Sequence, residues 1–209
     1  MSRTFIKICG ITRLVDALDA AQAGADAVGF VLARSARRIA AERAREIIAR
    51  LPPGLRTVGV FRGETADAVR RAAAIAGVDT IQLHGDEPPE WCAALGRPVI
   101  KRFEIRQDDG PASLRARTRS YGEAEAWLLD PGAGDGVSFE WARARGLGPR
   151  VILAGGLDAA NVARAMGQAA PWGVDVSSGV EASPGIKERR RLLAFVQAVR
   201  EEDERRATR

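Results

Sequence analysis

The sequence predicts an α/β fold, a parallel (β/α)₈ barrel, and three observations indicate it. Short runs rich in β-branched and aliphatic residues alternate with Ala-, Arg- and Glu-rich segments of helical period along the whole chain. Eight such strand and helix pairs follow one another, about one pair per 25 residues. A weak internal repeat, Gly-Ala-Asp or Gly-Val-Asp, stands where a helix hands over to a strand, at residues 24–26, 77–79 and 173–175.

This alternation places each expected strand and helix, and it also bears on the choice of fold. An open doubly wound sheet is the alternative fold, but it usually has fewer strands, and no G-x-G-x-x-G sequence follows the first strand. The sequence is therefore assigned to a single catalytic domain, residues 1–209, folded as a TIM barrel of parallel strands. Strands are expected at residues 5–9, 27–32, 57–61, 80–84, 99–103, 126–130, 151–154 and 174–177, and helices near 13–23, 40–50, 65–76, 87–95, 111–119, 139–145, 158–168 and 187–203.

Composition excludes several classes of protein. No apolar run approaches the roughly 20 residues that cross a bilayer, and residues 1–5 lead into a strand without a signal-peptide core, so a soluble cytoplasmic protein without a membrane partner is expected. Two cysteines and one histidine cannot supply a structural zinc site, and no metal is expected. The net charge is +5, but basic residues are scattered among acidic ones and aromatics are few, which argues against nucleic acid as a partner.

Lysine is rare in this chain. The 32 basic residues include only Lys7, Lys101 and Lys187, the rest being arginine. We interpret the arginine excess as a genomic bias. The three lysines are then expected where a compact ammonium group is needed and a planar guanidinium would not serve.

Chemistry on such a barrel is expected at the carboxyl ends of the strands. In the first strand the two-residue period points Lys7 and Cys9 into the barrel, with Cys9 at its end. Cys9 could be an inert buried hydrophobe, but an ammonium beneath it gives a setting that lowers a thiol pKa, which favours a catalytic role. Cys92 lies in a helical segment without a cation arranged around it and is expected to pack.

Three further polar residues follow strands. Asp130 ends an apolar strand before a glycine-rich loop, where it could cap the turn or act as a general acid. His84, the only histidine, follows the fourth strand with Gln82 on the same inward face, and a core histidine and a substrate contact remain equally open. Arg37, after the second strand, could be one more solvated arginine, and its position alone does not decide otherwise.

The last two strands end in small residues. Gly155 and Gly156 follow the seventh strand, and Ser177 and Ser178 follow the eighth. Backbone amides exposed on these two loops, before a short helical turn, form the usual phosphate site of this barrel class. A small phosphorylated molecule is therefore the expected ligand.

Ordered blocks along the chain carry a family resemblance. They are KICGIT at 7–12, GADAVGF at 24–30, VGVF at 58–61, QLHG at 82–85, LLD at 128–130, LAGGL at 153–157 and GVDVSSGVE at 173–181. In these blocks the whole chain resembles phosphoribosylanthranilate isomerase of tryptophan biosynthesis. The resemblance implies an Amadori rearrangement of N-(5-phosphoribosyl)anthranilate, an aminoaldose phosphate, to 1-(2-carboxyphenylamino)-1-deoxyribulose 5-phosphate, without metal or organic cofactor.

The resemblance also implies roles for individual residues. Asp130 would be the general acid and Cys9 the general base, and Arg37 would hold the anthranilate carboxylate. His84 and Asp175 would contact the sugar or order the site, while Gly155, Gly156, Ser177 and Ser178 would take the phosphate. The oligomeric state is left open between a monomer and a homodimer.

The chain departs from the family pattern after Asp130. The family usually has a Gly-Gly-Thr/Ser-Gly run before Phe-Asp-Trp, whereas here Gly134-Asp135-Gly136 precedes Phe139-Glu140-Trp141. Asp135 adds an unexpected carboxylate near a dianionic substrate, and its role is left open.

Three rival functions fit this sequence less well. The related histidine-pathway sugar isomerase has a carboxylate base where this chain has Cys9, and epimerase-like barrels need several metal-binding histidines where this chain has one. A catalytically silent phosphate-binding or scaffolding barrel would not need the acid and base that this sequence retains.

Overall fold

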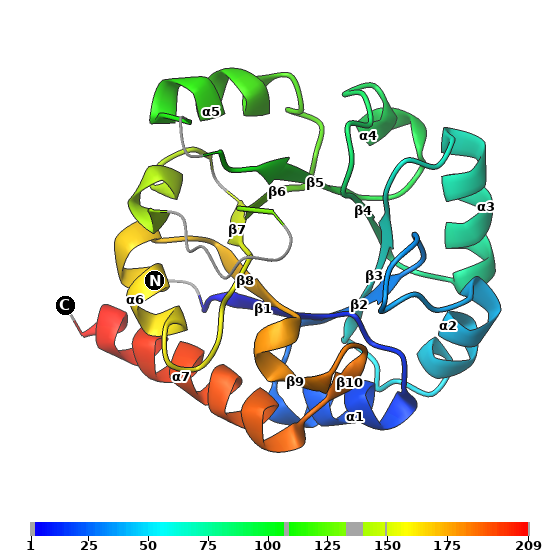
Figure 1. Ribbon diagram of the computed structural model, residues 1–209, viewed down its shortest axis with the longest axis horizontal. Helices are drawn as coiled ribbons and strands as arrows, with labels where there is room; N and C mark the ends of the chain where they lie inside the picture. Colours follow the sequence, from blue (N-terminus) through cyan, green and yellow to red (C-terminus); the bar gives the residue numbers. More distant parts are fainter. Residues whose placement is uncertain (1–2, 107–108, 133–139, 149, 209) are drawn as a thin grey trace.

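Eight parallel strands form a closed barrel in the computed structural model, which describes residues 3–106, 109–132, 140–148 and 150–208. Each strand pairs with its neighbours in chain order, and β1 pairs with β8. Figure 1 looks down this barrel, with the helices around the ring of strands. The predicted fold class is confirmed. The strands are β1 (Phe5–Cys9), β2 (Ala27–Val31), β3 (Arg56–Phe61), β4 (Thr80–Leu83), β5 (Val99–Glu104), β6 (Ala126–Asp130), β7 (Val151–Leu153) and β8 (Gly173–Val176).

Helices return the chain from the ends of most strands toward the start of the next, as parallel pairing requires. Several are shorter than the sequence indicates. The segment predicted at 87–95 is helical only over four residues, and the described part of 139–145 holds one 3₁₀ turn. The helices are α1 (Leu14–Ala23), α2 (Ala41–Ile48), α3 (Ala66–Ala76), α4 (Trp91–Ala94), α5 (Pro111–Arg119), α6 (Val162–Ala169) and α7 (Arg189–Ala207), with 3₁₀ turns η1 (Trp141–Ala144) and η2 (Ser178–Val180).

The internal repeat has a physical basis in two of its three copies. Gly24 and Gly77 end α1 and α3 in the left-handed conformation, at φ 93° and 73°, which glycine adopts without steric cost. Two residues later, Asp26 accepts the backbone N–H of Ile6 and Asp79 that of Thr57, each at 2.8 Å. The third copy differs, because its glycine already belongs to β8 and its aspartate, Asp175, points into the barrel.

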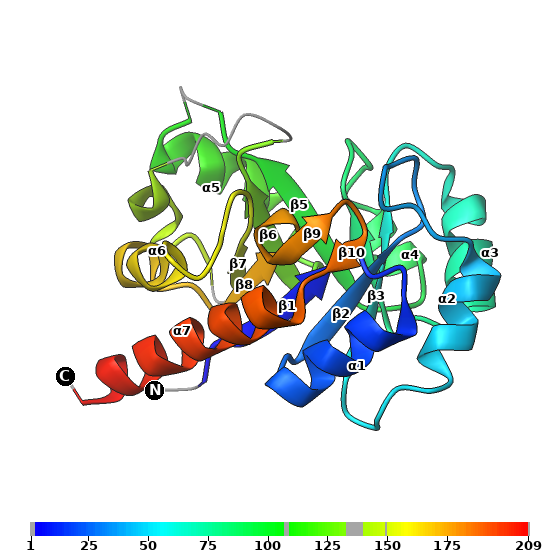
Figure 2. The ribbon, with the colours of Figure 1, turned by 60° about the horizontal axis from the view of Figure 1, so that its bottom comes forward.

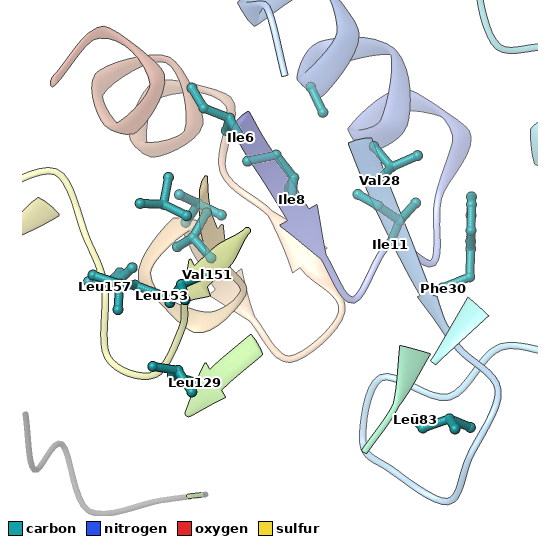
Figure 3. Close-up of a cluster of buried hydrophobic side chains, with 14 of the residues drawn as sticks. Ile6, Ile8, Ile11, Val28, Phe30, Leu83, Leu129, Val151, Leu153 and Leu157 are labelled. Atoms are coloured by element: carbon teal, nitrogen blue, oxygen red, sulfur yellow. The ribbon is translucent and has the colours of Figure 1, made fainter. Parts of the chain in front are cut away.

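The barrel has an inner and an outer apolar layer. The inner side chains are small or aliphatic and fill the interior below the carboxyl ends of the strands. The alternate side chains face outward and form one cluster with apolar side chains of the helices, and Figure 3 shows Ile6, Ile8 and Leu153 among its members. The inner layer consists of Ala27, Val58, Ile100, Ala126, Leu128, Ile152 and Ala154, with Phe5 and Trp172 packed against it.

A short antiparallel hairpin, β9 (Glu181–Ser183) and β10 (Ile186–Lys187), interrupts the pattern after β8. It was not predicted, and it takes Lys187 out of the helix expected at 187–203, which begins at Arg189 instead. Figure 2 shows the hairpin beside the end of β1. Thr12 in the loop after β1 donates its hydroxyl to the carbonyl of Gly185 at the hairpin turn, at 2.5 Å.

All three lysines are buried, each against one carboxylate. Their ammonium groups lie 2.8–2.9 Å from Asp175, Glu87 and Glu181, in the order Lys7, Lys101 and Lys187. The side chain of Lys7 is fully buried, and those of the other two are no more than 3% exposed. Each of the three lysines thus places its compact cation in an enclosed position.

Across the part of the chain that the structure describes, none of the helices combines the length and the apolarity that a bilayer crossing demands.

Candidate active site

A buried ion pair lies at the bottom of the candidate site, below the carboxyl ends of the strands. Lys7 and Asp175 lie opposite each other on the paired strands β1 and β8, and the Lys7 ammonium donates to Asp175 Oδ1 at 2.9 Å. Burial by itself would lower the pKa of Lys7, but the attraction of Asp175 and its hydrogen bond to the ammonium oppose this, and the pKa is raised. Lys7 therefore stays charged beneath the carboxyl ends of the strands.

Cys9 ends β1 directly above this cation. Its neighbour on β2 is Gly29, where a Cβ atom would come within 2.9 Å of the Cys9 sulfur and 3.2 Å of the Lys7 ammonium. Burial raises the pKa of the Cys9 thiol, and the opposing charge of Lys7 does not overcome it. The expectation of a lowered thiol pKa is thus wrong, because burial destabilises the thiolate by more than the charge of Lys7 stabilises it.

Asp130 ends β6 at the opposite side of the mouth. Its Oδ1 accepts the backbone N–H of Gly132 at 3.0 Å, and its Oδ2 lies 3.8 Å from Nε2 of His84. Asp130 therefore caps the turn after β6, which is one of the two roles expected of it. One oxygen holds the loop, while the other faces the histidine.

His84 is neutral at physiological pH. Burial and the charge of Arg102 lower its pKa to about 4, against the attraction of Asp130. Its Nδ1 lies 3.2 Å from the side-chain amide nitrogen of Gln82. If that amide donates, the imidazole proton is on Nε2 and points toward Asp130.

The Arg37 side chain extends across the end of β1 toward the β9–β10 hairpin. Its Nε and Nη2 form a two-pronged ion pair with Glu181, at 2.8–3.1 Å. A Cβ atom on Gly10 would lie 2.7 Å from Cδ of Arg37, so only glycine leaves room for this path. Arg37 is half-buried and paired, unlike its exposed neighbours Arg34 and Arg38, which argues against the solvated-surface alternative.

The loops after β7 and β8 pack closely together. Gly155 and Gly156 have φ values of 81° and 63°, and a Cβ on Gly179 would lie 2.0 Å from the carbonyl oxygen of Leu157. The Ser177 hydroxyl donates to the Cys9 carbonyl oxygen at 3.1 Å. That hydroxyl proton is therefore already engaged.

The structure brings together the residues expected at the site. The charges of Asp130 and Lys7 act on both His84 and Asp175, so these groups share one mouth. Cys92 lies elsewhere, buried in α4 within the outer layer, where burial raises its thiol pKa and Lys101 opposes the shift. Asp135 falls outside the described residues.

Three residues near the site had not been identified from the sequence patterns. Glu181 and Lys187 come from the unpredicted hairpin, and Arg102 from the inward face of β5 beside His84. The rarity of lysine was the one signal that singled out Lys187, and Arg102 was hidden among many arginines. Within the described ranges, we find no group of three or more His, Cys, Asp or Glu side chains able to hold a metal ion.

Comparisons with known proteins show the family of this chain. A family model described as N-(5'-phosphoribosyl)anthranilate (PRA) isomerase matches residues 6–198. The chain is 45% identical over 208 residues to the N-(5'-phosphoribosyl)anthranilate isomerase of Pseudomonas putida, which covers 96% of this chain and 100% of that protein.

Two solved structures are similar. One is the phosphoribosyl anthranilate isomerase of Thermus thermophilus, with a TM-score of 0.86 and 42% identity over 95% of this chain and 99% of that one. The other is a phosphoribosyl anthranilate isomerase in complex with reduced 1-(o-carboxyphenylamino)-1-deoxyribulose 5-phosphate, with a TM-score of 0.84 and 37% identity over the same shares. With a matching family model across most of its length and a close relative of equal extent, this chain belongs to the N-(5'-phosphoribosyl)anthranilate isomerase family.

Proposed function

We propose that this barrel isomerises N-(5-phosphoribosyl)anthranilate by acid and base catalysis, with Asp130 as the acid and Cys9 as the base. The protonated carboxyl of Asp130 gives its proton to the ribose ring oxygen, and the ring opens to an iminium ion. The Cys9 thiolate then removes the C2′ proton, which leaves an enolamine. Tautomerisation of the enolamine gives the ketone product and completes the Amadori rearrangement.

One observation carries this proposal. A thiol and a carboxyl end strands β1 and β6 at one mouth, with a fully buried cation beneath the thiol. The cation favours the thiolate at the moment of proton transfer, although the resting thiol keeps its proton. A substrate between the two strands can receive a proton on one side and lose one on the other.

The direct test is consumption of the substrate. N-(5-phosphoribosyl)anthranilate is fluorescent, and its disappearance on addition of the purified protein measures the isomerase reaction. A folded protein that leaves the fluorescence unchanged would favour the silent barrel instead.

We place the reaction in tryptophan biosynthesis in the cytoplasm, where free thiols such as Cys9 and Cys92 persist. We propose that the protein acts there as a monomer or a homodimer.

The phosphate is proposed to bind between the last two loops. The two loops meet where Gly179 of the turn after β8 approaches the carbonyl of Leu157, the residue after Gly156, and the small residues of both loops would leave backbone amides open to an anion. Asp175 is proposed to order the site through Lys7, and His84 to contact the sugar.

Arg37 is proposed to bind the anthranilate carboxylate, and replacing it by alanine is expected to raise KM roughly 10- to 100-fold with little change in kcat. The lost charge-assisted hydrogen bonds exist in both the bound substrate and the transition state. Steady-state kinetics measure this split. The exposed neighbour is the matched control, since Arg38→Ala should leave KM unchanged. The reverse pattern would transfer the role to Arg38.

The pH dependence separates the two catalytic groups. In an Asp130→Asn variant the proposed acid no longer titrates, and the pKa of His84, lowered to about 4, keeps that ring neutral. Burial raises the pKa of Cys9, so the thiolate fraction is small near neutrality and grows about tenfold per pH unit. The residual kcat/KM of this variant should therefore rise with that slope between roughly pH 6 and 8. A flat profile would contradict the thiolate as the base.

A further inference from the structure

We propose that Glu181 is a positioning residue for substrate binding, because its carboxylate aims the guanidinium of Arg37 at the substrate carboxylate. This inference rests on the proposed function, which assigns Arg37 to that carboxylate. It adds a residue from an element, the β9–β10 hairpin, that lies outside the eight strands of the barrel.

The geometry of the ion pair leaves one edge of the guanidinium free. Glu181 Oε1 accepts from Arg37 Nε at 2.9 Å, and Oε2 accepts from Nη2 at 2.8 Å. This side-on pair uses Nε and one N–H of Nη2. The end-on edge, formed by Nη1 and the second N–H of Nη2, has no hydrogen-bond partner among the described residues. An end-on edge binds a carboxylate through two parallel hydrogen bonds.

Glu181 is itself held in place from three directions. Lys187 donates to Oε1 at 2.9 Å, the backbone N–H of Gly185 donates to the same oxygen at 3.1 Å, and Arg191 donates to the backbone carbonyl of Glu181 at 2.6 Å. Burial alone would raise the pKa of Glu181, but Arg37 and Lys187 lower it, so the carboxylate stays ionised. Its side chain is 4% exposed, against 27% for Arg37, so a fixed anion holds a more accessible cation.

The same network reaches the catalytic base. The Lys187 ammonium donates to the backbone carbonyl of Cys9 at 2.5 Å and to that of Ser177 at 3.2 Å. Arg37 crosses Gly10, the residue after Cys9, on its way to Glu181. Hydrogen bonds from the hairpin thus hold both Arg37 and the end of β1.

The substitution Glu181→Gln tests this selectively. Three donors, Arg37 Nε, Lys187 and Gly185, converge on Oε1, so the amide oxygen should take that position. The amide NH₂ group then replaces Oε2 and faces Nη2 of Arg37, donor against donor. The hairpin keeps its contacts with Lys187 and Gly185, whereas Arg37 loses its orientation.

The expected result is a rise in KM of about tenfold with kcat nearly unchanged, as one misdirected charge-assisted bond would produce. Combining Glu181→Gln with Arg37→Ala should raise KM no further than Arg37→Ala alone, because both act on one contact. Additive effects of the two substitutions on KM, or a loss confined to kcat, would overturn the proposal.

A binding measurement distinguishes a loss of the Arg37 orientation from a general distortion of the binding site. Reduced 1-(o-carboxyphenylamino)-1-deoxyribulose 5-phosphate and its phenylamino counterpart without the carboxylate are titrated calorimetrically into the native protein and the Glu181→Gln variant. The variant should bind the carboxylated compound about tenfold more weakly and the other compound equally well. Equal weakening of both would overturn the proposal, since it would mean that the hairpin only supports the site.

Two further comparisons separate this proposal from the proposed function. As a control, Arg189→Ala removes an ion pair with Asp19 at the start of α7 and touches neither Glu181 nor Arg37, so the preference for the carboxylated compound should survive it. If the native protein does not distinguish the two compounds, the role of Arg37 in the proposed function fails. If it does distinguish them and Glu181→Gln leaves the preference intact, only the role of Glu181 fails.

Discussion

Replacing Cys9 by alanine is expected to lower kcat by at least about 100-fold, the lower end of what a general base contributes. Alanine cannot accept the C2′ proton, and the Lys7 ammonium beneath it remains paired with Asp175. The variant should stay folded, because Cys9 ends its strand at the mouth of the barrel and alanine is small enough for the space beside Gly29. Circular dichroism and the substrate fluorescence assay measure the two quantities.

The second cysteine provides the control for Cys9. Cys92→Ala changes a buried residue of the outer layer and should leave turnover unchanged. Inactivation by iodoacetamide should follow labelling of Cys9, should accelerate as pH rises toward the raised thiol pKa, and should be slowed by the product. A folded Cys9→Ala protein with near-native turnover, or inactivation that follows labelling of Cys92, would refute the assignment of the base.

Asp130→Asn is expected to lower kcat by at least about 100-fold as well, because an amide has no proton to give the ring oxygen. The asparagine oxygen can still accept the backbone N–H of Gly132, so the start of the following loop should keep its conformation. KM should change little, since proton donation stabilises the transition state rather than the bound substrate. The same fluorescence assay, run over a range of substrate concentrations, gives kcat and KM separately.

Glu104 is the matched control for the acid. It lies opposite Asp130 in the register of β5 and β6, and its carboxylate is about half exposed. Glu104→Gln should retain native kcat. If Glu104→Gln abolished turnover while Asp130→Asn preserved it, the acid would belong to β5 and the proposed order of proton transfers would have to be rewritten.

The sequence patterns located the strand ends well because they are local. A run such as Phe5–Cys9 carries its two-residue period within itself, and the period places Lys7 and Cys9 on one face before any partner strand is known. The ordered blocks then predicted the family, and the comparisons confirm it. The individual roles of Cys9, Asp130, Arg37 and the phosphate loops remain predictions that the experiments above test.

The sequence by itself determined the eight parallel units, the family and which side chains stand at the strand ends, because these depend on spacing along the chain. Only the tertiary structure decided the pKa values and the orientations of those side chains. The Cys9 thiol pKa rises because the folded barrel excludes water from both faces of β1, and Arg37 acquires its direction from Glu181, 144 residues away. Burial and long-range ion pairs are properties of the closed barrel, and no local pattern of residues encodes them.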